Sequence, residues 1–136
     1  MANKIELLVV DTNLWVSFLI SHSYSKLDKV LKAGSARLIF STELLEEFIE
    51  VAARPKFKKI FSSADIASLL SDIHLYADFV EVTSAVNICR DDKDNFLLAL
   101  SQDGNADFLL TGDEDLLTLK KFGKTRIMTL SDYLKL

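Results

Sequence analysis

Acidic side chains occur at three places where an apolar run of the chain ends or begins. They are Asp11, Asp91, Asp92, Asp94 and Asp113. Asp11 directly follows the apolar run 7–10, and Asp113 follows the run 108–110 after a two-residue turn. Two carboxylates about 4 Å apart repel each other by roughly 4 kcal/mol at an effective dielectric constant near 20, so a cluster of acids needs a cation or shared protons. Because oxygen-only ligand sets suit Mg²⁺ or Mn²⁺, we expect acids from these three places to bind such a metal.

Each acid taken singly also has a simpler explanation, which is helix capping. An acid at a helix start gains about 0.3–1 kcal/mol from the helix dipole. Asp91 would cap a helix that opens at its own segment, and Asp113 or Glu114 would cap the next helix. Capping explains Asp11 less well, because this residue ends a strand that we expect to be buried on both faces.

A fourth candidate acid comes from a predicted helix that carries four glutamates. They are Glu43, Glu46, Glu47 and Glu50, and the apolar stripe of the same helix is Leu44, Phe48 and Val51. At about 100° per residue, Glu47 lies about 40° from Val51, beside the stripe, whereas Glu46 points largely away from it. We therefore choose Glu47, and a solvated helix face accounts for the other three.

Short apolar runs alternate with segments of helical period along the chain. The runs that we expect to be strands are 5–10, 38–40, 79–82, 108–110 and 127–128. A helix is expected over 64–77, with an apolar stripe of Ile66, Leu69, Leu70, Ile73 and Ala77 and a capping pattern from Ser62 to Asp65. A second helix should run through 95–100, and a mostly apolar one should follow Asp11, with Trp15 and Phe18 in the core.

Strands that alternate with helices imply parallel pairing and right-handed crossovers. We predict a three-layer α/β/α fold with a central, mostly parallel sheet of four or five strands, formed by residues 1–136 as a single domain. Ligands of such sheets bind beyond the carboxyl ends of the strands. The predicted fold therefore brings the acidic groups to one edge.

The bulk composition indicates a compact soluble protein in a reducing compartment. Of the 136 residues, 49% are hydrophobic and 26% are charged, which argues against disorder. The single cysteine, Cys89, excludes an internal disulfide and favours the cytoplasm, and we expect it to be a small buried residue at a strand end. His22 and His74 lie far apart, so a zinc site is not expected. No signal peptide and no apolar run of membrane-spanning length is visible.

Four short segments appear in an order that has a family counterpart. They are 9–13 (VVDTN), 44–48 (LLEEF) with 54–57 (RPKF), 91–95 (DDKDN) and 110–117 (LTGDEDLL). Together they span nearly the whole chain and resemble the PIN-domain family, especially the VapC-like toxin ribonucleases of prokaryotic toxin–antitoxin systems. The resemblance implies a PIN-like fold and a metal-dependent endoribonuclease that hydrolyses RNA phosphodiester bonds, often a homodimer and often silenced by an antitoxin protein.

The resemblance also implies which residues form the site. The catalytic positions would be Asp11, Glu47, Asp94 and Asp113, and the supporting positions would be Thr12, Asn13, Asp91, Thr111 and Asp115. The expected metal ligands are Asp11, Asp94 and Asp113, with Glu47 acting directly or through water. One or two ions of Mg²⁺ or Mn²⁺ held there would activate a water molecule for attack on the RNA.

A local basic run is the candidate for contact with RNA phosphates. It consists of Arg54, Lys56, Lys58 and Lys59 in a chain whose net charge is −4. A solvated helix end explains this run equally well. The net negative charge counts against a passive nucleic-acid binder unless the acids gather around a divalent cation.

Other families with an acid after the first strand fit less well. A haloacid-dehalogenase-like phosphatase needs a second Asp two positions later, where this chain has Asn13. A response-regulator receiver domain usually has paired acids at its first strand and a lysine after its fifth, where this chain has Thr129 and Leu130. The remaining alternative is a catalytically silent PIN-like domain that binds an RNA or protein partner, and the presence of all four acids argues against it.

Overall fold

The computed structural model describes residues 5–21, 25–57, 59–60 and 62–136. In this part of the chain, six strands form one sheet in the order β3-β2-β1-β4-β6-β5. The strands are β1 (Glu6–Val10), β2 (Ala36–Phe40), β3 (Ala77–Phe79), β4 (Phe108–Leu110), β5 (Lys121–Phe122) and β6 (Thr125–Met128). All neighbours pair in parallel except β5, which pairs antiparallel with β6. The predicted parallel sheet is confirmed, and the two-residue β5 adds a strand too short for an apolar pattern to reveal.

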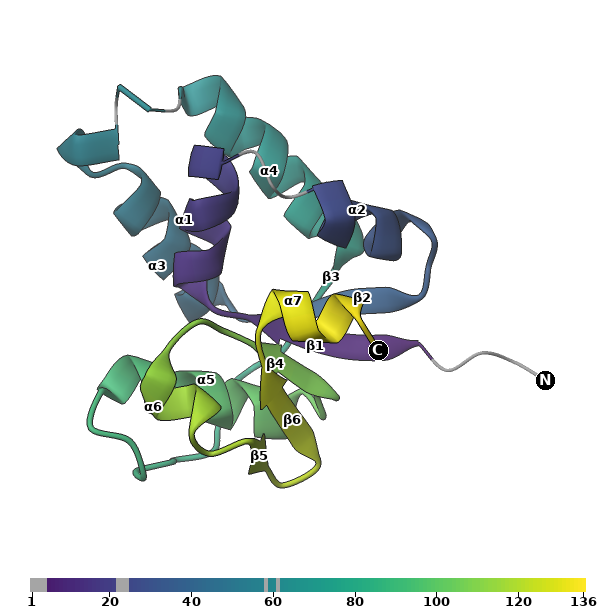
Figure 1. Cartoon of the computed structure of the whole chain (residues 1–136). Coiled ribbons are helices and arrows are strands. Elements are labelled where there is room, and N and C mark those ends of the chain that lie inside the picture. Colours follow the sequence, from purple (N-terminus) through teal and green to yellow (C-terminus); the bar gives the residue numbers. More distant parts are fainter. Residues whose placement is uncertain (1–4, 22–24, 58, 61) are drawn as a thin grey trace.

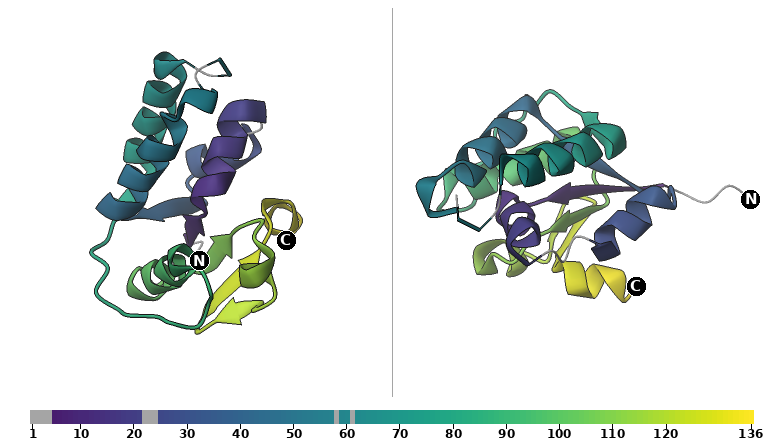
Figure 2. Two further views of the ribbon diagram at one scale, coloured as in Figure 1. Left: turned by 90° about the vertical axis from the view of Figure 1, so that its left-hand side faces the viewer. Right: turned by 90° about the horizontal axis from the view of Figure 1, so that it is seen from above.

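Helices cover both faces of this sheet (Figures 1 and 2). They are α1 (Thr12–Ser21), α2 (Ser25–Lys32), α3 (Thr42–Ala52), α4 (Ser63–Tyr76), α5 (Asp92–Asp103), α6 (Glu114–Leu117) and α7 (Leu130–Leu134), with a 3₁₀ turn η1 (Pro55–Phe57). Figure 1 shows α5 on one side of the sheet and α1, α2 and α4 on the other, which is the predicted three-layer α/β/α arrangement. None of the helices described is both long and apolar enough to cross a membrane.

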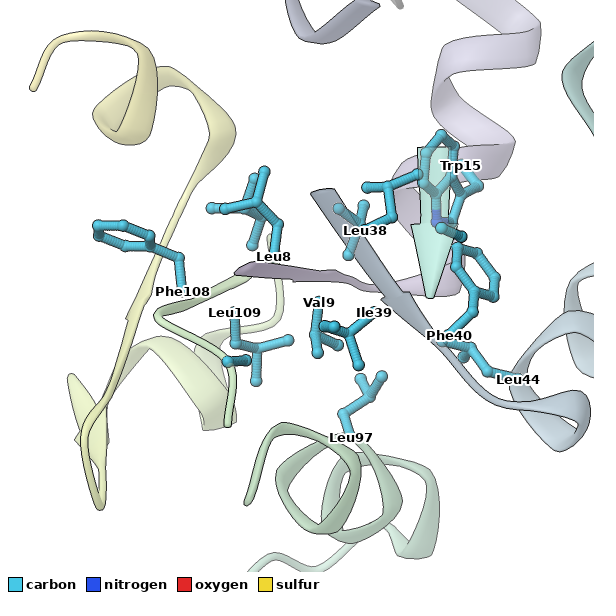
Figure 3. Close-up of a cluster of buried hydrophobic side chains, with 14 of the residues drawn as sticks. Leu8, Val9, Trp15, Leu38, Ile39, Phe40, Leu44, Leu97, Phe108 and Leu109 are labelled. Atoms are coloured by element: carbon cyan, nitrogen blue, oxygen red, sulfur yellow. The ribbon is translucent and has the colours of Figure 1, made fainter. Parts of the chain in front are cut away.

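The three central strands each contain a short apolar run whose side chains are buried on both faces of the sheet. Val9, Ile39 and Leu109 point toward Leu97 of α5, whereas Leu8 lies on the opposite face (Figure 3). On that second face, β1 and β2 pack against Trp15 of α1, and Phe108 of β4 packs against the ring of Tyr133 from α7 at 5.1 Å. Trp15 and Phe18 are both buried, which confirms the prediction that they belong to the core.

The predicted helix over 64–77 is confirmed as α4, which begins with a capping box. The Ser62 hydroxyl accepts a hydrogen bond from the Asp65 amide, and the Asp65 carboxylate accepts one from the Ser62 amide. Leu69 and Ile73 of the predicted stripe are buried. Ala77 is also buried, but it belongs to β3 and not to the helix.

The prediction of a strand over 79–82 is wrong by two to three residues. The register of β2 and β3 pairs Leu38 with Ala77 and Phe40 with Phe79. One further hydrogen bond joins the Val80 amide to the Phe40 carbonyl at 2.8 Å. Beyond it, Ser41 turns away from the sheet as the N-cap of α3, so β2 offers no partner for the residues that follow Val80.

The environments of Cys89 and His74 differ from one another and only partly match the predictions. Cys89 is partly buried, as expected, but it lies in an irregular segment before α5 and not at a strand end. Burial and the neighbouring negative charges raise the pKa of its thiol, so it is a poor nucleophile. His74 is exposed on α4, and its Nδ1 lies 2.8 Å from the Leu70 carbonyl oxygen. His22 lies outside the described residues.

Candidate functional site

The ends of β1 and β4 bring Asp11 and Thr111 side by side. The register pairs Val10 with Leu110, and the Asp11 amide donates to the Leu110 carbonyl at 3.0 Å. The Thr111 hydroxyl then donates to Asp11 Oδ2 at 2.8 Å, and the Asn13 amide donates to Asp11 Oδ1 at 3.1 Å. Asp11 is only 7% exposed, so both of its carboxylate oxygens are held in fixed positions.

Thr111 also fixes the next acid along the chain. Its hydroxyl oxygen accepts a hydrogen bond of 3.0 Å from the Asp113 amide. The Asp113 carboxylate caps α6 by accepting from the Asp115 amide at 2.8 Å, as Asp91 caps α5 by accepting from the Lys93 amide at 2.9 Å. The capping explanation is therefore correct for Asp113 and Asp91. It leaves a second carboxylate oxygen of Asp113 for another partner.

Asp94 cannot be explained as a cap. It lies in the first turn of α5, is 4% exposed, and its Oδ2 has no hydrogen-bond partner among the described residues. Carboxylate oxygens of Asp94, Asp113 and Asp115 all lie within 4.8 Å of one another. Burial first, and then the negative charges of neighbours led by Asp113, raise the pKa of Asp94 to about 6. A buried carboxylate in this position requires either a proton or a cation.

Electrostatics connects Asp11 to the same group of acids. Burial raises the pKa of Asp11, the hydrogen bonds from Thr111 and Asn13 oppose that rise, and the charges of Asp113 and Glu47 add to it. Asp11 is likewise among the charges that raise the pKa of Asp94. The charges of Asp11, Glu47, Asp94 and Asp113, which come from separate stretches of the chain, therefore influence one another.

Glu47 faces this group from α3, whereas Glu46 is exposed. The Glu47 carboxylate accepts a hydrogen bond from the Thr12 hydroxyl at 3.3 Å and forms an ion pair with Lys93 at 3.2 Å. Its side chain is 26% exposed. The helix position predicted from the apolar stripe thus coincides with the glutamate that reaches the other acids.

These side chains line a cavity of about 170 Å³. The predicted residues around it are Asp11, Thr12, Asn13, Glu47, Asp94 and Asp113, together with Asp91 and Arg54. Thr111 is fully buried behind the cavity. Asp115 is not part of the cavity lining, and its carboxylate is held by Arg90 Nη2 at 2.9–3.0 Å.

The predicted basic run does not converge on the site as a unit. Arg54 lines the cavity, whereas Lys56 and Lys59 are exposed and do not line it, and Lys58 lies outside the described residues. Sequence reasoning missed Lys93, which supplies a second cation at the cavity. Lys93 lies between Asp92 and Asp94 in the sequence, and this position could have indicated a cation close to the acids.

Sequence reasoning also missed the role of Asn95, which fixes the start of α5. Its side-chain oxygen accepts hydrogen bonds from the Ile88 and Cys89 amides, and its Nδ2 donates to the Cys89 carbonyl. Asn95 thereby ties the irregular segment before α5 to the first turn of that helix. This turn contains Asp94, so Asn95 sets where the buried acid lies.

The donor set fits a hard divalent cation. The ligand atoms are carboxylate oxygens without histidine or cysteine, as Mg²⁺ and Mn²⁺ prefer. The unpartnered Asp94 Oδ2 is the most specific sign, because a buried acceptor oxygen without a donor is costly. Asp94, Asp113 and Asp115 are the closest set, and Asp11 lies on the same cavity as the first two.

Comparisons with known proteins agree with this architecture. Residues 7–115 match the family model of the PIN domain. Among solved structures, the fold is similar to that in a crystal structure of VapBC2 from Rickettsia felis bound to a DNA fragment from their promoter, with a TM-score of 0.61 at 15% sequence identity. The similarity covers 89% of this chain and 96% of the other. The comparison with curated proteins gave no match. Because the family match extends over most of the chain and includes all the acids described above, this chain belongs to the PIN domain family.

Proposed function

We propose that this protein is a metal-dependent endoribonuclease that hydrolyses RNA phosphodiester bonds, and that it is the VapC-like toxin of a toxin–antitoxin pair. The observation that carries the proposal is the buried Asp94 carboxylate, which lacks a donor for Oδ2 and lies within 4.8 Å of Asp113 and Asp115. Membership in the PIN domain family supports the same reading.

The charges of the site favour a bound cation over shared protons at neutral pH. The pKa of Asp94 is raised only to about 6, so this group is mostly ionised at pH 7. Lys93 and Arg90 each pair with an acid at the edge of the group, namely Glu47 and Asp115. Among the described residues, no ion pair involves Asp94, Asp11 or Asp113, so the negative charges of these three acids are the least compensated.

The residues of the site would have three roles: metal binding, orientation of a ligand and proton transfer. Asp11, Asp94 and Asp113 would hold Mg²⁺ or Mn²⁺, with Asp115 as a further ligand or as a support through Arg90. The ion would supply an activated water and neutralise charge on the scissile phosphate. Thr111 and the Asn13 amide fix the orientation of Asp11. Glu47, whose carboxylate contacts the Thr12 hydroxyl and Lys93, would accept a proton from the attacking water or act through a water molecule.

A polymeric anion as substrate agrees with the two cations at the cavity. Arg54 lines the cavity, and the Lys93 ammonium stands beside Glu47. Both side chains are exposed, so they remain available to phosphates that flank the metal site.

The toxin assignment rests on the similarity to the VapBC2 structure, in which the VapC-like fold occurs in a complex bound to promoter DNA. We propose by analogy that a small antitoxin protein binds this chain and suppresses its activity. Expression of this protein alone should arrest growth of the host, and co-expression of a small reading frame adjacent to its gene should relieve the arrest. Unimpaired growth at a verified protein level would contradict the toxin assignment.

Cleavage of a fluorescent RNA tests the enzymatic assignment. The wild-type protein should cleave the RNA with Mn²⁺ and lose activity in EDTA, and Asp11→Ala should be inactive while retaining the wild-type circular dichroism spectrum. Glu46→Gln, on the exposed side of α3, is the matched control and should cleave at the wild-type rate. Equal cleavage by wild type and Asp11→Ala would overturn the proposal, and preferential cleavage of single-stranded DNA would change the substrate.

A further inference from the structure

The 170 Å³ cavity lined by Asp11, Asp94 and Asp113 is called the acid cavity below. A second cavity, of about 360 Å³, adjoins it. The two cavities share the lining residues Glu47, Val51, Arg54 and Lys93. The second cavity extends away from the metal-site acids between α3 and α5, which supply most of its walls. A substrate that extends from the acid cavity past the four shared residues, which form the shared wall, therefore enters the space between α3 and α5.

The shared wall carries the positive charge of this region. Lys93 Nζ lies 3.2 Å from Glu47 Oε1, and its side chain is 63% exposed. Arg54 is exposed, and its guanidinium remains charged at any physiological pH. Two cations at the junction of the cavities suit a phosphate of the nucleic-acid backbone. This phosphate would be the neighbour of the one that lies at the acids.

The far part of the second cavity has the opposite character. Its remaining lining residues are Glu43, Glu50, Asp92 and Phe96. Three carboxylates would repel a second phosphate. Phe96 is only partly buried, so part of its ring faces the cavity beside Val51. An aromatic ring and ionised carboxylates together suit a nucleobase, which stacks on the ring and donates N–H groups to acceptor-only side chains.

We propose that this second cavity is the subsite for the base of a nucleotide adjacent to the scissile phosphate, and that it favours adenine, cytosine and guanine over uracil. The inference rests on the proposed nuclease function. The three favoured bases carry an exocyclic amino group that donates hydrogen bonds to a carboxylate. Uracil offers a single N–H between two carbonyl oxygens, which the carboxylates repel. Arg54 and Lys93 hold the phosphate that joins this nucleotide to the scissile position.

Titration with nucleoside 5′-monophosphates tests the subsite without any cleavage. In ¹H–¹⁵N spectra recorded with Mg²⁺, AMP, CMP and GMP should shift the backbone amides of Val51, Arg54 and Phe96. UMP should bind about fivefold more weakly or worse. Shifts confined to other parts of the protein, or equal binding of UMP and the other three, would overturn the subsite.

Variants of the wall give a second measurement. Phe96→Leu should weaken binding of all four nucleotides, because the stacking surface is lost. The triple variant Glu43→Gln, Glu50→Gln and Asp92→Asn should bring UMP binding level with the others, because neutral amides both donate and accept hydrogen bonds. Glu46→Gln is the control, since Glu46 is exposed on the same helix and lines neither cavity. Discrimination against UMP that persists in the triple variant would overturn the role of the carboxylates.

The same preference should appear in cleavage of RNA oligomers in which uridine replaces each position near the cut in turn. One flanking position should tolerate uridine poorly in the wild type and well in the triple variant. RNA that is not cleaved, combined with the expected nucleotide shifts, would overturn the nuclease assignment alone. RNA that is cleaved without any base preference at a flanking position would overturn the subsite alone.

Discussion

The Thr111 hydroxyl donates a hydrogen bond of 2.8 Å to Asp11 Oδ2 and accepts one of 3.0 Å from the Asp113 amide. Asp11 and Thr111 lie 100 residues apart in sequence, at the ends of the adjacent strands β1 and β4. This fully buried threonine therefore sets the relative position of two acids that come from different segments. It acts on the site without lining the cavity.

Replacing Thr111 by valine should weaken metal binding while preserving the fold. The variant removes a hydrogen bond that opposes the raised pKa of Asp11, and it leaves the Asp113 amide without its acceptor. Loss of such a supporting contact typically lowers metal affinity about 10–100-fold. Titration calorimetry with Mn²⁺ measures this effect.

Thr125→Val is the matched control. The Thr125 hydroxyl is also buried and donates to the Ala106 carbonyl at 2.7 Å, away from the acids. Both variants should lose about 1–2 kcal/mol of unfolding free energy, but only Thr111→Val should lose metal affinity. Equal Mn²⁺ affinities in the two variants would show that Thr111 has no special role.

The metal-free protein should become less stable between about pH 4 and pH 6. The unfolded chain releases the Asp94 proton near the ordinary pKa of 3.8, whereas the folded protein retains it up to about pH 6. Within this interval the folded state binds more protons, so the free energy of unfolding decreases as the pH rises. The raised pKa of Asp11 acts in the same direction. The lowered pKa of Asp103 acts below about pH 3.8, outside the interval.

Asp94→Asn should remove most of this pH dependence and raise the unfolding free energy at pH 7 by about 2 kcal/mol in EDTA. Urea denaturation of both proteins at pH 4.5 and pH 7 measures the difference. Parallel pH profiles of the two proteins would refute the assignment of the effect to Asp94. Saturating Mn²⁺ should stabilise the wild type at pH 7 and leave the variant nearly unchanged.

The layout of the fold was predictable because each central strand contains a short apolar run and α4 shows a helical period. Leu8, Val9 and Val10 of β1 are buried, with side chains on both faces of the sheet, and Ser62 and Asp65 mark the start of α4 correctly. The end of β3 was not predictable from its own sequence. It depends on Ser41, which follows β2 and leaves the sheet as the N-cap of α3. The pairing of β5 depends similarly on the turn around Gly123, whose φ is +59°.

The acids of the site could be predicted from the sequence, but the cations that lie beside them could not. Position after a strand selected Asp11 and Asp113, and helix period selected Glu47. Lys93 was not selected, because its ion pair with Glu47 joins α5 to α3, and no local pattern relates these helices. The basic run was over-interpreted for the same reason: sequence adjacency groups Arg54 with Lys56, whereas the cavity includes only Arg54.

Arg54 should therefore contribute more to RNA binding than Lys56. In an Asp11→Ala background that prevents cleavage, Arg54→Gln should weaken binding of a fluorescent RNA and reduce the slope of log K against log salt by about one. Lys56→Gln should have a smaller effect, since this side chain is exposed near Phe57 outside the cavity. Fluorescence anisotropy over a salt series measures both. Equal losses would indicate a diffuse basic surface instead of a contact at the cavity.

Gly104→Ala should destabilise the fold without changing the chemistry of the site. Gly104 follows α5, and an added Cβ would lie 2.5 Å from Ile39 Cγ2, a buried methyl group of β2. Forcing these groups apart should cost about 1–3 kcal/mol. Gly112→Ala is the control, because a Cβ there meets nothing within 4 Å. Similar melting temperatures of the two variants would contradict the close packing of α5 on β2.

Calorimetric titration of the metal-free wild type and Asp94→Asn with Mn²⁺ at pH 7 tests the central claim most directly. The wild type should bind Mn²⁺ with release of heat or protons, and Asp94→Asn should lose most of that affinity while unfolding as cooperatively as the parent protein. If the wild type fails to bind the ion, or if the folded variant binds it equally well, the buried carboxylate is not a metal ligand and the proposed nuclease mechanism is wrong.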